Sequence, residues 1–398
     1  MIERKNKKIE LAVLVGVATP KVKPFQAQEH LDELRRLAET AGAQVVATFL
    51  QRVQHFNPAT LIGEGKVQEI FQTLESHNAQ MVIFDEDLSG SQVRNLEARL
   101  PGIKVLDRTG LILDIFAKHA QTAESRLMVE VAQMQYMMPR LTRAWAHLCR
   151  QAGTGGGTPG IGMRGPGETQ LEVDRRLVRN RIQELKSKLK KIERNRKMQA
   201  DRRDDIFHVG IVGYTNAGKS TLTNRLTGAG VYVEDKLFAT LDSTTRKLHL
   251  GDGQCIILSD TVGFIRKLPH HLVETFKSTL GVAAHADCIL EVVDASASDY
   301  KEHMEVTHNV LGELLPNEIP RLRVFNKADR ADPMRQEELH THFPDALQVS
   351  ALENIGMEAL KQLLLDHLAI WQQQRMQQIQ EAEEAPEGWV SEPLSTHQ

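Results

Sequence analysis

The chain has 398 residues and a formal net charge of −3, with 49 Lys and Arg against 52 Asp and Glu. This length allows two or three domains, and so balanced a charge gives no indication of the partner. The three cysteines lie far apart without metal or redox spacing, which argues against a zinc site and favours a reduced, cytoplasmic setting.

Short apolar runs alternate with helical patterns over residues 1–106, which predicts a small N-terminal α/β domain with a mostly parallel sheet. The apolar run 11–18 follows basic residues like a signal peptide, but it is too short to span a bilayer, and a first strand explains it better. No other run is long and apolar enough for a transmembrane helix. The expected strands are residues 11–17, 45–50, 81–84 and 104–106, with helices such as 28–40 and 67–77 between them.

Two seams of apolar residues, spaced alternately by four and three, predict an antiparallel pair of helices within residues 107–204. Pro139 is expected to kink the first helix. The Met and Trp side chains of the first seam are expected in the core of the pair. The seams are Leu127, Val131, Met134, Met138, Leu141, Trp145 and Leu148, and Val178, Ile182, Leu185, Leu189 and Ile192.

The glycine-rich segment 153–169 joins these two helices and is far longer than a hairpin needs. We interpret it as a tip that folds against a partner, where Arg164 pairs with phosphate; the alternative is a passive linker. The second helix is basic, with 13 Lys and Arg against three Asp and Glu between residues 175 and 203. Backbone contacts to a large folded RNA explain this charge better than a solvated helix face.

A phosphate-binding loop lies between a predicted buried strand, residues 206–212, and a predicted helix that opens at residue 220. Its glycines let backbone N–H groups close around phosphate oxygens, its lysine reaches the β- and γ-phosphates, and its hydroxyl ligates Mg²⁺. We therefore expect a nucleotide-binding domain over residues 205–371. The loop consists of Gly213, Tyr214, Thr215, Asn216, Ala217, Gly218, Lys219 and Ser220.

Three later segments, each after a strand-like apolar run, favour GTP over ATP. Asp260 would reach Mg²⁺ through water, and the Gly263 N–H would meet the γ-phosphate. The carboxylate of Asp329 can accept from guanine N1–H and the 2-amino group together, a pair of donors that adenine lacks. An ATPase or a chance match is the alternative. The segments are Asp260, Thr261, Val262 and Gly263, then Asn326, Lys327, Ala328 and Asp329, then Ser350, Ala351 and Leu352.

Together these motifs resemble the translation-factor class of GTPases, and the segment before Asp260 resembles the first switch of the Obg–HflX branch. The resemblance implies that Thr240 supplies a second hydroxyl to Mg²⁺, with Thr244 and Thr245 as alternatives. The segment is Phe238, Ala239, Thr240, Leu241 and Asp242.

Phe264 follows Gly263, at the position where many GTPases carry the Gln that orients the attacking water. Phe cannot hydrogen-bond a water, so either hydrolysis is slow alone or another group positions the water. The catalytic residue is therefore unknown, with Lys219 and Asn216 assisting. In K⁺-activated GTPases an Asn at this loop position helps to ligate K⁺, so K⁺-stimulated hydrolysis is a hypothesis; a loop-capping role for Asn216 is the alternative.

Residues 107–116 and 165–172 resemble hallmark segments of the HflX family, and the resemblance covers about residues 9 to 371. It implies an α/β fold with a P-loop GTPase domain and a ribosome-associated GTPase that needs Mg²⁺. Such a protein binds the large ribosomal subunit and its RNA, places the glycine-rich tip near the peptidyl-transferase centre, and splits stalled or idle ribosomes under stress. The glycine-rich segment is longer here than we expect from close relatives.

Two other functions stay open at this stage. One is a GTP-regulated switch that binds a protein partner such as a membrane protease complex. The other is an RNA-remodelling enzyme whose N-terminal domain uses ATP, for which the sequence offers no helicase motif. We expect a monomer without membrane insertion, ending in a frayed helix and a disordered tail over residues 372–398.

Overall fold

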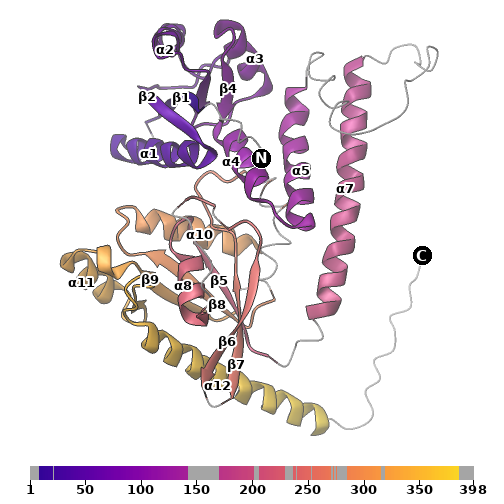
Figure 1. The fold of residues 1–398 in the computed structure, drawn as a ribbon, viewed down its shortest axis with the longest axis vertical. Coiled ribbons are helices and arrows are strands. Elements are labelled where there is room, and N and C mark those ends of the chain that lie inside the picture. The colour runs from indigo at the N-terminus through magenta and orange to yellow at the C-terminus, as the bar shows by residue number, and fades with distance from the viewer. Residues whose placement is uncertain are drawn as a thin grey trace, which may run out of the picture.

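The computed structural model describes residues 9–20, 22–141, 170–200, 206–228, 236–238, 240–251, 253–269, 272, 275, 285–314 and 319–384. The glycine-rich segment 153–169, the seam residues Trp145 and Leu148, and residues 385–398 lie outside these ranges. Figure 1 shows an N-terminal α/β layer above a second α/β domain, with two long helices standing side by side along one flank. Within the described ranges, no helix is long and apolar enough to cross a membrane.

The N-terminal domain contains a sheet of order β2-β1-β3-β4, and its strands are parallel, in agreement with the predicted mostly parallel sheet. Alternate side chains of β1 face opposite layers: Ala12 and Leu14 pack with α1 and α4, whereas Val13 and Val15 pack with α2 and α3. Helix α4 belongs to this packing, so the domain extends beyond the predicted limit at residue 106. The elements are β1 (Glu10–Ala18), α1 (Pro24–Ala41), β2 (Ala43–Arg52), α2 (Glu64–Ser76), β3 (Met81–Phe84), α3 (Gly90–Arg99), β4 (Lys104–Asp107) and α4 (Arg108–His119).

Helices α5 (Ala123–Met137) and α7 (Gln170–Ala200) form the predicted antiparallel pair. The seams meet in one buried cluster that includes Val131, Leu141, Val178, Ile182 and Leu185. The prediction that Pro139 kinks a continuing helix is wrong, because the α-helix ends at Met137 and a 3₁₀ turn, Met138–Arg140, follows. A proline ring excludes the i−4 hydrogen bond and so ends the regular helix.

The C-terminal domain is a six-stranded sheet of order β10-β9-β8-β5-β7-β6, parallel except for β6 against β7. Helix α12 continues past Gln372 to Glu384, so the predicted start of a tail at residue 372 is too early. The strands are β5 (His208–Gly213), β6 (Thr244–Gly251), β7 (Gln254–Asp260), β8 (Cys288–Asp294), β9 (Arg321–Asn326) and β10 (Leu347–Gln348), and the helices are α8 (Lys219–Thr227), α10 (Tyr300–Leu314), η3 (Ala328–Arg330), α11 (Pro333–His342) and α12 (Met357–Glu384).

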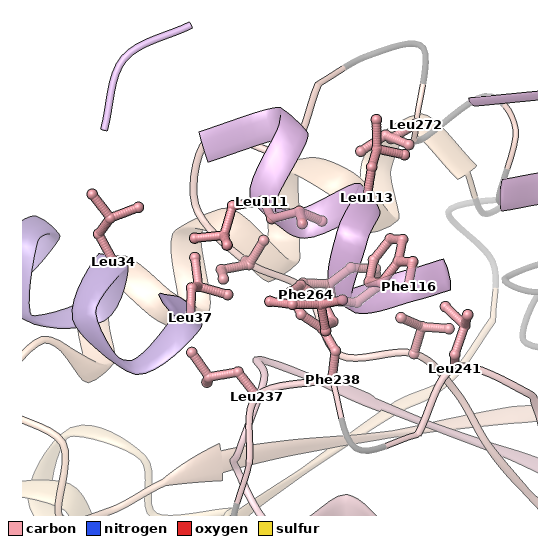
Figure 2. Close-up of a cluster of buried hydrophobic side chains, with 14 of the residues drawn as sticks. Leu34, Leu37, Leu111, Leu113, Phe116, Leu237, Phe238, Leu241, Phe264 and Leu272 are labelled. Atoms are coloured by element: carbon pink, nitrogen blue, oxygen red, sulfur yellow. The ribbon is translucent and has the colours of Figure 1, made fainter. Parts of the chain in front are cut away.

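An apolar cluster joins the two α/β domains (Figure 2). Leu37 of α1 and Leu111 and Phe116 of α4 face Phe238 and Phe264 of the C-terminal domain. The Phe116 and Phe238 rings meet edge to face with their centroids 4.7 Å apart. Because these side chains are at most 3 % exposed, the contact is a continuous core rather than a loose domain interface.

A buried ionic network continues this contact. Glu33 of α1 accepts from Arg108 and from Arg266, whose Nη2 lies 2.9 Å from the carboxylate. The Tyr214 hydroxyl donates to the same carboxylate at 2.6 Å. Asp85 pairs with Arg108 at 2.8 Å and with Lys267 at 2.6 Å. The phosphate loop and the segment after Gly263 are thus tied to the N-terminal domain by charge-assisted hydrogen bonds.

Candidate guanine nucleotide site

The phosphate loop connects β5 to α8 with the expected geometry. Gly213 has φ +146°, and a Cβ there would collide with the Val292 carbonyl oxygen, so only glycine fits. The Lys219 ammonium is buried and donates to the carbonyl oxygens of Gly213 at 3.1 Å and Tyr214 at 2.8 Å. Burial lowers the pKa of Lys219 to about 8, and the attraction of the Asp260 carboxylate offsets only part of this effect.

Three oxygens converge beside the loop. The Ser220 hydroxyl lies 2.8 Å from the Thr240 hydroxyl and 2.5 Å from an Asp260 carboxylate oxygen. The other Asp260 oxygen is buried and has no hydrogen-bond partner among the described residues, and burial raises the pKa of this carboxyl. A hard, oxygen-preferring cation such as Mg²⁺ fits this group of hydroxyls and carboxylate.

The two alternatives to Thr240 lie elsewhere. Thr244 is exposed at the first position of β6, and the Thr245 hydroxyl lies 2.9 Å from the Ser259 hydroxyl. The geometry therefore favours Thr240 as the second Mg²⁺ hydroxyl.

The base side of the site is built on β9. The Asn326 amide donates to the Ala217 carbonyl at 2.9 Å, and its oxygen accepts from the Ala351 N–H at 3.1 Å. The Asn326 side chain thus fixes the phosphate loop relative to the segment of Ser350, Ala351 and Leu352. Lys327 adopts a left-handed conformation, φ 62°, and its ammonium pairs with Asp294 at 2.8 Å.

These parts surround one cavity of about 280 Å³. The lining includes most of the predicted contact residues and adds Thr221, Lys236 and Arg330, which motif matching could not find because they stand outside the motifs. Ala239 lies outside the described residues. The predicted residues in the lining are Thr215, Asn216, Gly218, Lys219, Ser220, Phe238, Thr240, Thr261, Gly263, Asn326, Lys327, Asp329, Ser350, Ala351 and Leu352.

Other predicted residues lie next to the cavity without lining it. Gly213 and Ala217 contribute backbone, Asp260 faces the hydroxyls of Ser220 and Thr240, and Tyr214 turns toward Glu33. Leu241 and Asp242, also predicted to contact the nucleotide, lie outside the lining: Leu241 is buried in the interdomain cluster, and Asp242 binds the start of α5. Val262 and Ala328 are likewise buried outside the lining.

Phe264 is 1 % exposed and packs among the leucines between the domains (Figure 2), and it is not among the residues that line the cavity. Its backbone pairs with the phosphate loop, because the Thr215 N–H donates to the Phe264 carbonyl at 2.7 Å and the Phe264 N–H to the Gly213 carbonyl at 3.0 Å. Phe264 therefore anchors the segment after Gly263 rather than orienting a water.

Asp242 belongs to another domain and binds Thr122, the N-cap residue of helix α5. Its carboxylate accepts from the Gln121 N–H at 2.9 Å and from the Thr122 hydroxyl at 2.6 Å. Burial alone would raise the pKa of Asp242, but the hydrogen bonds from Thr122 and its neighbours outweigh burial and lower it. The segment that carries Thr240 is thereby joined to the first helix of the pair.

We expect Asp242→Ala to lower the free energy of unfolding by about 1–2 kcal/mol, the usual cost of losing hydrogen bonds to a charged acceptor. Asp242→Asn keeps one acceptor and should lose less. Asp114→Ala, at an exposed carboxylate 3.6 Å from Lys104, is the matched control. Urea unfolding measures all three; equal stability of Asp242→Ala and the control would contradict a stabilising contact between Asp242 and the start of α5.

Comparison with known proteins agrees with this geometry. Three family profiles match in succession: "GTP-binding GTPase N-terminal" over residues 28–117, "GTP-binding GTPase Middle Region" over 119–203 and "50S ribosome-binding GTPase" over 208–327. The chain is 50% identical to a GTPase HflX from Caldanaerobacter subterraneus over 80% of this chain and 73% of the relative. It is 44% identical to GTPase HflX of Escherichia coli over 90% of this chain and 83% of the relative.

Among solved structures, the chain resembles the SsGBP and GDP complex with a TM-score of 0.51 and 25% identity, over 90% of this chain and 98% of that one. The shared domain order, the nucleotide cavity and the extent of identity agree on one conclusion. The chain belongs to the HflX family of GTPases, and its reaction is the hydrolysis of GTP to GDP and phosphate.

Proposed function

We propose that this GTPase acts in the cytoplasm, as a monomer, by binding the large ribosomal subunit and splitting stalled or idle ribosomes in a GTP-dependent way. The observation that carries the proposal is the basic face of α7. Val178, Ile182 and Leu185 are buried against α5. The exposed basic side chains of this helix point to solvent, where they can meet RNA phosphates, and Lys188 also pairs with Glu184 on the same helix. The exposed ones are Arg176, Arg179, Lys186, Lys188, Lys190, Lys191 and Arg194.

The description of the matching profile, a 50S ribosome-binding GTPase, supports the same partner. A phosphate backbone is bound through charge, so binding to ribosomes should weaken as salt rises. The glycine-rich segment 153–169 would extend from the far end of the helix pair into the subunit.

At the nucleotide site, we propose that the phosphate loop from Gly213 to Ser220 holds the phosphates and that Asp329 with the loop at Ser350 reads guanine. Ser220 and Thr240 would ligate Mg²⁺ directly and Asp260 through water. Mg²⁺ supplies charge neutralisation of the β- and γ-phosphates when bound. GTP would order Thr240 and Gly263 and stabilise the ribosome-binding state, and hydrolysis would release the protein.

Sedimentation of ribosomes with the protein and GTP tests this function. The intact chain should convert joined ribosomes to free subunits, and a chain lacking residues 153–167 should still hydrolyse GTP but fail to split them. Charge neutralisation of Lys186, Lys190 and Lys191 should weaken ribosome binding at least tenfold at low salt. Neutralising two lysines of the C-terminal domain, the exposed Lys301 and the half-buried Lys361, is the control. Binding unaffected by the α7 changes would point to a protein partner.

We also propose that K⁺ stimulates hydrolysis through Asn216. Its left-handed φ of 59° holds the residue in the wall of the phosphate cavity, and the Phe264 ring cannot replace the missing Gln. Hydrolysis should be about tenfold faster or more in K⁺ than in Na⁺, and Asn216→Ala should remove the difference while leaving GDP binding in place. Equal rates in the two salts, with and without ribosomes, would contradict K⁺ activation.

A further inference from the structure

The loop of residues 350–355 follows β10 and contributes Ser350, Ala351 and Leu352 to the cavity lining, where their backbone would back the O6 of a bound guanine. The Ser350 N–H donates to the Ile355 carbonyl at 3.0 Å and the Ile355 N–H to the Ser350 carbonyl at 3.0 Å, which closes the loop at its base. The Ser350 hydroxyl accepts from the Glu353 N–H at 3.0 Å. These bonds fix the ends of the loop but leave the carbonyls at its tip to be held by another group.

That group is Arg225, two turns into α8. Its Nε donates to the Ala351 carbonyl at 2.9 Å, and its Nη2 donates to the Leu352 carbonyl at 2.7 Å. A guanidinium holds its donors in a rigid planar fork, so it fixes the two carbonyls relative to each other. Such charge-assisted bonds are stronger than bonds between neutral groups. Helix α8 begins at Lys219, so the same helix would hold the phosphates at one end and this loop further along.

Peptide geometry connects Arg225 to the base. In a trans peptide the carbonyl and the N–H point in opposite directions, so the Ala351 carbonyl directed at Arg225 turns the Leu352 N–H the other way. Ala351 and Leu352 line the cavity, and Arg225 stays outside the lining. A cation at the carbonyl also polarises the peptide and strengthens its N–H as a donor.

We propose that Arg225 is a positioning residue that sets guanine specificity by aiming the Leu352 N–H at the O6 of the base, since the Ala351 N–H already donates to Asn326. This rests on the guanine site proposed above. Asp329 would read N1–H and the 2-amino group directly, whereas Arg225 would act on O6 through the backbone of the loop. It touches no nucleotide atom and adds no step to hydrolysis.

The test compares the affinities for GDP and 6-thio-GDP, which differ only in the atom at C6, in the wild type and in Arg225→Met. Sulfur is a weak acceptor, so the wild type should bind GDP about tenfold more tightly. Arg225→Met should lose most of this ratio, because its GDP affinity falls far more than its 6-thio-GDP affinity. Arg225→Lys should restore part of the ratio.

Arg335→Met is the matched control, since Arg335 on α11 contacts Glu338 and the Tyr300 ring away from the cavity. Its ratio should equal that of the wild type. An equal loss of both affinities in Arg225→Met, or no loss, would overturn the inference and leave Arg225 a structural residue. A wild type that binds neither nucleotide would instead refute the proposed guanine site itself.

Discussion

GTP hydrolysis should fall at least a hundredfold in Lys219→Ala, which is the magnitude found when one fixed donor to a developing charge is removed. Lys219 is 6 % exposed, and the carbonyls of Gly213 and Tyr214 hold its ammonium in the cavity wall. The variant loses the positive charge that would neutralise the β- and γ-phosphates. It keeps the Asp260 carboxylate that would face Mg²⁺, so the metal site itself should stay intact.

The same substitution should not destabilise the nucleotide-free protein. Burial lowers the pKa of Lys219, which means that folding disfavours its charge, and removing the charge removes that cost. The melting temperature without nucleotide should therefore stay equal or rise, while the increase caused by GDP should shrink or vanish. Lys361→Ala, at a half-buried lysine 2.8 Å from Glu358 and outside the cavity lining, is the control and should keep both properties. A nucleotide-free Lys219→Ala protein that melts well below the wild type would contradict this account.

Glu33→Gln should lower the free energy of unfolding by about 3–5 kcal/mol, the cost of removing one partner from a buried ion pair. Glu33 is 2 % exposed and is the shared acceptor of Arg108, Arg266 and Tyr214. Glutamine keeps the shape but leaves Arg266 with less compensating charge between the domains. Glu39→Gln, at an exposed position of the same helix, is the matched control and should change stability by less than about 0.5 kcal/mol.

The pH dependence of unfolding gives a second readout. Burial by itself would raise the pKa of Glu33, but Arg108 and Arg266 outweigh it and hold the pKa below its ordinary value. A carboxyl with a lowered pKa stabilises the fold above its unfolded pKa, and this stabilisation is lost as the pH falls through the folded pKa. The wild type should therefore lose stability in acid more steeply than Glu33→Gln. Parallel curves measured by urea unfolding at pH 7 and below pH 4.5 would contradict the role of Glu33.

The strands and the nucleotide motifs were predictable because they depend on short-range patterns. A run such as β3, Met81–Phe84, is apolar throughout because both faces of the sheet are covered, and the sequence shows that directly. The order of the G-x-x-x-x-G-K-[ST] and N-K-x-D motifs predicts the cavity in the same way. The positions of the residues that line it follow from where parallel strands end.

The contacts between domains were not predictable, because they join residues far apart in sequence. Glu33 and Arg266 are 233 positions apart, and Thr122 and Asp242 are 120 apart. A carboxylate in a switch segment gives no local signal that it binds the N-cap residue of a helix in another domain. Arg225 illustrates the same limit, since one arginine in a helix is ordinary until its distance to the Ala351 carbonyl is known.

These contacts also suggest how the parts work together. The segment with Thr240 ends in Asp242 at the start of α5, and the segment with Gly263 continues into Arg266 at α1. Nucleotide-dependent movement of the Thr240 segment would therefore shift its contact with the helix pair, and movement of the Gly263 segment would shift its contact with the N-terminal domain. Such movement needs differential contacts in the two states, which the γ-phosphate would supply at Thr240 and Gly263.

We propose that GTP binding, rather than hydrolysis, drives ribosome splitting by this protein. The most direct test is sedimentation of joined ribosomes with the protein and a non-hydrolysable GTP analogue, compared with GDP. The proposal predicts free subunits with the analogue and joined ribosomes with GDP. Joined ribosomes in both samples would contradict it.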